Sequence, residues 1–177
     1  GKYPEFHIQE AYEAAEMAAR ESVVLLKNDG VLPLDKTADV VFCGKRSKDF
    51  VLIPASVAAS TDLGTNPYGR ACELSGTEHV RYEVAGKETK YWIVTVGADA
   101  CEGADRLTMD MDEDDRLELE RALKEAEAAG GKLILIVNAT GPVNLSAYES
   151  RVSAIVCPFF AGMMSGKVTA DILFGLV

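Results

Sequence analysis

Residues 91–97 read Tyr-Trp-Ile-Val-Thr-Val-Gly, and residues 133–137 read Leu-Ile-Leu-Ile-Val. Short runs that are almost entirely apolar predict strands buried on both faces, which is typical of a parallel sheet. The segment between them predicts one long helix, with Asp112 as its cap and Gly130-Gly131 at its end. Its inward stripe has three- and four-residue spacing and consists of Leu119, Ala122, Leu123 and Ala126.

The same strand and helix signals recur along the chain. Further strands are predicted at residues 40–44, 79–84 (an edge strand) and 152–156, and further helices at residues 9–27, 66–74 and 165–174. The inward face expected for the first helix consists of Ala11, Ala15, Ala18, Ser22 and Leu25. Apolar strands that alternate with amphipathic helices predict a single α/β domain over residues 1–177. Its fold class is an open, mostly parallel sheet with helices on both faces.

Composition limits the possible partners. The 177 residues carry a net charge of -10, which argues against binding to nucleic acid or to an anionic membrane surface. No apolar run approaches the roughly 20 residues that span a bilayer. The four cysteines form no Cys-x-x-Cys pair, and Cys43 and Cys157 lie in apolar runs, so buried thiols and a reduced, cytoplasmic setting are favoured. His7 and His79 are interpreted as structural, and no metal or organic cofactor is expected.

The loop that follows the strand at residues 91–97 contains the acidic residues Asp99, Glu102 and Asp105 together with Arg106. Ligands of open parallel sheets bind at the carboxyl ends of the strands. Glu102 is therefore a candidate proton donor, with Asp105 and Arg106 fixing the loop through a charge-assisted pair. The alternative is a solvated acidic loop that precedes a helix.

Residues 158–169 form a second loop of interest, because a strand, a glycine-containing turn and a helix follow one another there. Gly166-Lys167 resembles part of a phosphate-binding loop, but Ala161 and Val168 stand where that motif needs Gly and Ser or Thr. A nucleotide-binding protein is therefore a minor alternative. The pair Phe159-Phe160 could line a sugar site or belong to the core.

Three segments together resemble the C-terminal α/β domain of family 3 glycoside hydrolases. Residues 19–34, with Leu-Leu-Lys-Asn followed by Leu-Pro-Leu, are similar to the segment with which this domain begins. Residues 102–106, Glu-Gly-Ala-Asp-Arg, match the Glu-Gly-x-Asp-Arg loop of many β-glucosidases, and residues 170–175 match the closing helix. The similarity extends over about residues 9–177 and is weakest at residues 45–82.

The resemblance implies a retaining β-glycosidase that hydrolyses terminal β-linked sugars such as β-glucosides. In this family the nucleophile is an Asp of a separate (β/α)8 barrel, so no residue of this chain is expected to be the nucleophile. Glu102 is then the general acid/base, with Asp105 and Arg106 supporting its loop. The chain is expected to be one domain of a larger protein, to partner the barrel domain of the same polypeptide, and to be inactive alone.

One departure from the family pattern favours a different function. The family has Pro-Gly-x-Glu-Gly-Gly where this chain has residues 161–166, Ala-Gly-Met-Met-Ser-Gly, so the glutamate of that loop is missing. The altered Gly162–Gly166 loop supports a second hypothesis, a non-catalytic carbohydrate-binding or interaction module with the same fold.

Overall fold

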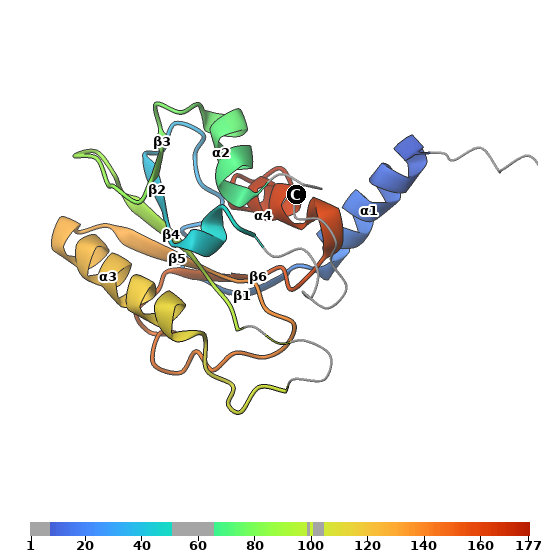
Figure 1. Cartoon of the computed structure of the whole chain (residues 1–177). Coiled ribbons are helices and arrows are strands. Elements are labelled where there is room, and N and C mark those ends of the chain that lie inside the picture. The colour runs from blue at the N-terminus through green and yellow to red at the C-terminus, as the bar shows by residue number, and fades with distance from the viewer. Residues whose placement is uncertain (1–7, 51–65, 99, 101–104) are drawn as a thin grey trace, which may run out of the picture.

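The computed structural model describes residues 8–50, 66–98, 100 and 105–177 of the chain (Figure 1). Six strands form one sheet in the order β1-β6-β5-β4-β2-β3. Strands β2 to β6 are parallel, and β1 pairs antiparallel with β6. The predicted open, mostly parallel sheet is therefore confirmed. The strands are β1 (Val24–Asn28), β2 (Val40–Cys43), β3 (Val80–Tyr82), β4 (Tyr91–Val96), β5 (Lys132–Val137) and β6 (Ala154–Cys157).

Helices cover both faces of the sheet, as predicted (Figure 1). Helix α3 lies on one face, and α2 and α4 lie together on the other, while α1 extends away from the end of α4. The helices are α1 (Ile8–Ser22), α2 (Pro67–Ser75), α3 (Glu113–Ala129) and α4 (Ser165–Leu173), with short 3-10 turns η1 (Lys45–Ser47) and η2 (Gly162–Met164).

The two faces of the central strands form two separate apolar layers, because successive side chains of a strand point to opposite sides. Val94 and Leu135 belong to the layer beneath α3, whereas Ile93 and Ile134 belong to the layer beneath α2 and α4. All four are fully buried. Burying each such side chain contributes about 1.5–3 kcal/mol, and the predicted inward stripe of α3 is buried throughout. These two layers hold the carboxyl ends of the strands in place.

The prediction for residues 23–27 was wrong. Helix α1 ends at Ser22, and Val24–Asn28 form strand β1. The side chains expected to face inward are not buried: Leu25 is 49% exposed, and of the described α1 side chains only Ala19 is buried. The β-branched pair Val23-Val24 favours an extended backbone. Pairing with β6 gives the backbone of this segment the hydrogen-bond partners that a helical turn would otherwise provide.

Other predicted boundaries hold to within two residues. Asn66 caps α2, because its side-chain oxygen accepts a hydrogen bond from Gly69 N at 2.7 Å. Strand β6 begins at Ala154, two residues later than the predicted strand. Cys43 and Cys157 are buried free thiols, as expected, and burial raises the pKa of Cys43 to about 12 and that of Cys157 to about 11.

Candidate active site

The strand order contains one point at which the chain reverses its direction across the sheet. From β2 the chain first adds β3 on one side, and it then continues through β4, β5 and β6 on the other. The chain that follows β2 leads to α2 on one face of the sheet, whereas the chain that follows β4 leads to α3 on the other. Open parallel sheets bind their ligands at such a point. The segment after β2 begins with Gly44, and the segment after β4 begins with Gly97. The acidic loop singled out in the sequence thus begins at the switch point of the sheet.

Arg46, from η1 after β2, crosses this switch point. Its Nε donates to the Asp115 carboxylate at 2.5 Å, and its Nη2 donates to Asp112. Both acids lie at the start of α3. Asp112 is the N-cap residue of this helix, as predicted, but its side chain makes no capping hydrogen bond. Burial raises the pKa of Asp115, while the adjacent Arg46 guanidinium favours its ionised form. The ion pairs tie the segment after β2 to the first turn of α3.

Gly97 is the other fixed point of this cluster. Its N–H donates to Asp115 Oδ2 at 2.9 Å, and its carbonyl accepts a hydrogen bond from Asp112 N at 3.0 Å. A Cβ at Gly97 would lie 2.5 Å from the Asn138 carbonyl oxygen and 3.1 Å from the Arg46 guanidinium, so only glycine fits. The segment that leaves the sheet at Gly97 therefore returns to the same place at Asp112.

The predicted site residues belong to this segment. Glu102 lies outside the described residues. Asp105 is exposed, and Arg106 is half-buried, with its Nη2 donating to the Pro142 carbonyl at 2.8 Å. Arg106 Nη1 is buried and has no hydrogen-bond partner among the residues that the structure describes. Arg106 thus connects the returning part of the loop to the connection between β5 and β6.

The carboxyl ends of β5 and β6 contribute two more residues, Asn138, which no sequence pattern singled out, and Phe159, for which the sequence left a sugar site or the core open. Asn138 follows β5, is fully buried, and donates through Nδ2 to the Phe159 carbonyl at 3.0 Å. Phe159, two residues after β6, has a φ of 53°, and its side chain is 38% exposed. The interpretation of Phe159 as a core residue is therefore wrong.

The resemblance to a phosphate loop finds no support in the geometry of α4. Lys167 Nζ donates to Glu16 at 2.8 Å and to Asp171 at 2.9 Å, so its charge is engaged by two carboxylates. Ser165 and Gly166 at the start of α4 are buried. Lys167 therefore joins α1 to α4 and does not extend toward an anion at the helix start.

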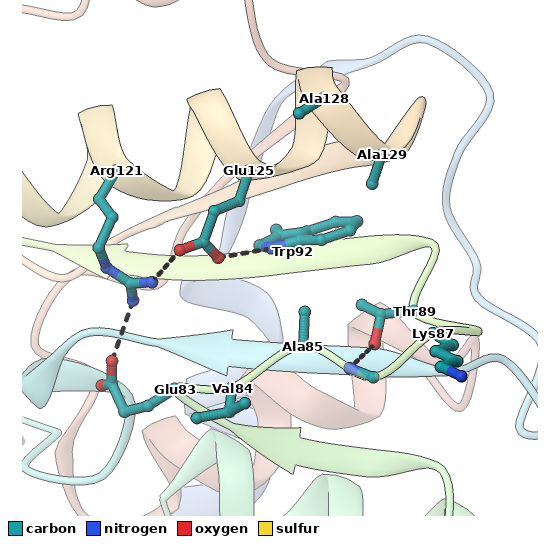
Figure 2. Close-up of a pocket in the computed structure, with 11 residues that line it drawn as sticks. Glu83, Val84, Ala85, Lys87, Thr89, Trp92, Arg121, Glu125, Ala128 and Ala129 are labelled. Carbon is teal, nitrogen blue, oxygen red and sulfur yellow. Dashed lines mark hydrogen bonds and ion pairs between the residues drawn. The ribbon is translucent and has the colours of Figure 1, made fainter.

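A separate groove of about 670 Å³ lies between α3 and the connection from β3 to β4 (Figure 2). Arg121 joins Glu125 at 2.5 Å and Glu83 at 3.0 Å, and Trp92 Nε1 donates to Glu125 at 3.4 Å. These polar groups therefore serve as hydrogen-bond partners for one another. Trp92 lies near the amino end of β4 and Gly97 follows its carboxyl end, so the indole lies at the other end of the strand from the switch point.

Within the described ranges, no group of three or more His, Cys, Asp or Glu side chains is arranged to hold a metal ion. Among the helices described, none combines the length and apolar character needed to cross a membrane.

Comparisons with known proteins agree with this fold. Residues 23–177 match the model of the glycosyl hydrolase family 3 C-terminal domain. A probable beta-glucosidase L of Neosartorya fischeri is 27% identical over 91% of this chain, and the matched region is 26% of that protein. The fold is shared with a GH3 beta-glucosidase of Bifidobacterium adolescentis (TM-score 0.81, 22% identity, 98% of this chain and 28% of that one). It is also shared with beta-glucosidase 3B of Thermotoga neapolitana, solved in complex with α-D-glucose (TM-score 0.82, 16% identity, 98% of this chain and 30% of that one).

The chain thus spans less than a third of the length of these relatives. Because the family model covers nearly all of the sequence, the chain belongs to glycosyl hydrolase family 3, whose C-terminal domain it represents.

Proposed function

We propose that this chain is one domain of a longer retaining β-glycosidase and that its loop after β4 supplies the general acid/base, Glu102. The substrate class is a terminal β-linked sugar, with β-glucosides first, because the relatives are named as beta-glucosidases and one of them was solved with glucose. Those relatives are more than three times as long as the matched region. The remainder of the polypeptide is expected to include the (β/α)8 barrel.

One observation carries this proposal: the segment that contains Glu102 starts at the switch point of the sheet, where open parallel sheets bind their ligands. Its start and its end are joined by the backbone hydrogen bond from Asp112 to Gly97 and are held by Arg46. A catalytic group needs a rigid attachment of this kind, because small displacements of the reacting atoms lower the reaction rate by large factors.

The proposed reaction divides the chemistry between two domains. An Asp of the barrel attacks the anomeric carbon, and Glu102 donates a proton to the departing glycosidic oxygen. Glu102 then removes a proton from the water that releases the sugar from the barrel Asp. The two carboxyl groups of retaining enzymes are about 5–5.5 Å apart, so neither domain completes the reaction alone. Arg106, bonded to the Pro142 carbonyl, and Asp105 are the proposed supports of the loop.

The test is hydrolysis of cellobiose, an unactivated β-glucoside, by this chain alone and by the full-length gene product. Glu102→Gln is compared with Glu88→Gln, which removes an exposed carboxylate from the β3–β4 connection. We expect turnover only in the full-length protein, a loss of about 100-fold or more in Glu102→Gln, and normal turnover in Glu88→Gln. Full activity of Glu102→Gln would remove this residue from the mechanism.

A non-catalytic carbohydrate-binding module remains a second candidate, because the Gly162–Gly166 loop has no carboxylate and instead forms η2 and the buried start of α4. A full-length protein that binds glucose but hydrolyses neither cellobiose nor an activated aryl β-glucoside would favour the module. Turnover that depends on Glu102 would exclude it.

A further inference from the structure

Phe159 combines two properties that are unfavourable for a residue without a function. Its φ of 53° lies in the left-handed region, which is costly for a bulky residue. Its ring is 38% exposed, and it belongs to neither apolar layer of the core.

One buried residue holds Phe159 in this conformation. The Asn138 side chain, fully buried, donates to the Phe159 carbonyl at 3.0 Å, and its backbone N–H donates to Val96 O at 2.8 Å. Val96 is the last residue of β4, directly before Gly97. Asn138 therefore connects the strained residue after β6 to the start of the loop that contains Glu102. The backbone of Phe159 is thus fixed relative to the carboxyl end of β4.

The distance between the two strands suits a sugar. Strands β6 and β4 are separated only by β5, and neighbouring strands lie about 4.8 Å apart, so the ends of β6 and β4 are about 10 Å apart. A sugar that lies over the carboxyl ends of β6, β5 and β4 is therefore long enough to contact a residue that follows β6 and to extend its glycosidic oxygen toward the end of β4. The exposed face of a phenyl ring is apolar and electron-rich, and the C–H face of a β-linked pyranose is apolar and slightly positive.

We infer that Phe159 is a sugar-contacting residue, whose ring packs on a pyranose at the carboxyl edge of the sheet, and that Asn138 is its positioning residue. The inference rests on the proposed function. It adds a specificity determinant that contributes to binding and takes no part in proton transfer.

The variant Phe159→Gly separates this role from a structural one. Glycine accepts a φ of 53° without strain, so the melting temperature of the full-length gene product is expected to stay the same or rise. The dissociation constant for glucose, measured by calorimetry, is expected to increase about tenfold through loss of the aromatic contact. Phe159→Trp restores a flat aromatic face and is expected to bind glucose within about twofold of the wild type. Val84→Ala, which trims an exposed apolar side chain in the β3–β4 connection, is the control and should leave binding unchanged.

The outcomes are decisive in both directions. An unchanged dissociation constant in Phe159→Gly, or a fall of several degrees in its melting temperature, would overturn the inference. A wild-type protein that binds no glucose would overturn it as well. The proposed acid/base role fails separately, when Glu102→Gln retains turnover, because glucose binding is measured without any bond being broken.

Discussion

The substitution Asp171→Asn tests how the helices α1, α2 and α4 are held together. Asp171 is 1% exposed, and its two oxygens accept hydrogen bonds from Arg70 Nε at 2.8 Å and from Lys167 Nζ at 2.9 Å. Asparagine keeps the shape of the side chain but directs an N–H group at one of the two cations, so one charge-assisted hydrogen bond is lost and the other is weakened. Such bonds contribute about 1.5–3 kcal/mol each. Arg70 and Lys167 are partly exposed and keep Glu73 and Glu16 as second partners, which reduces the loss.

We therefore expect Asp171→Asn to lower the free energy of unfolding by about 2–4 kcal/mol. For a domain of this size, about 3 kcal/mol corresponds to a fall of about 6–12 °C in melting temperature. Urea unfolding at pH 7, followed by far-ultraviolet circular dichroism, measures the change. Glu113→Gln is the matched control, because Glu113 pairs with Arg116 on the exposed side of α3, where a lost pair costs at most about 1 kcal/mol. If both variants lose the same small amount, the buried carboxylate does not hold the helices together and the reasoning is refuted.

Three further substitutions or conditions follow from the geometry. Gly97→Ala places a Cβ 2.5 Å from the Asn138 carbonyl oxygen and is expected to cost about 1–3 kcal/mol in urea unfolding; a neutral result would mean that the end of β5 moves freely. Asn66→Ala removes the cap of α2 and is expected to cost about 1 kcal/mol, whereas Asn66→Asp should be close to neutral. Above pH 9 the unfolded chain loses the thiol protons of Cys43 and Cys157, whereas burial raises the pKa of these groups in the folded state to about 12 and about 11. The free energy of unfolding should therefore fall as the pH rises from 9 toward 11, by up to about 1.4 kcal/mol per pH unit for each thiol, and the slope should be smaller in Cys157→Ala; equal slopes would contradict this assignment.

The sequence predicted the central strands and α3 because each is specified locally. Strands β4 and β5 are apolar along nearly their whole length, and α3 has both an apolar stripe and a glycine at its end. Strand β1 was missed because its leucines continue the spacing of the preceding helix. Only its pairing with β6, which lies far along the chain, makes Val24–Asn28 extended.

The candidate site likewise has parts that the local sequence indicates and parts that depend on tertiary contacts. Loops that follow buried strands can be found from sequence, and the acidic loop was found in this manner. The ion pairs of Arg46 with Asp112 and Asp115 join segments far apart in the sequence, so no local pattern indicates them. The left-handed backbone of Phe159 depends on the side chain of Asn138, a tertiary contact that the aromatic pair itself does not reveal.

The antiparallel pairing of β1 with β6 affects how this domain folds during translation. Val24 pairs with Cys157, so the first strand of the described sheet pairs with the last. Until the ribosome has added residues 154–157, β1 has no neighbour, and the apolar side chains of Val24, Leu25 and Leu26 are open to other nascent chains. A translation product that stops before β6 is therefore expected to aggregate through this strand. A chaperone that binds short apolar segments would find a target in β1 until β6 has been made.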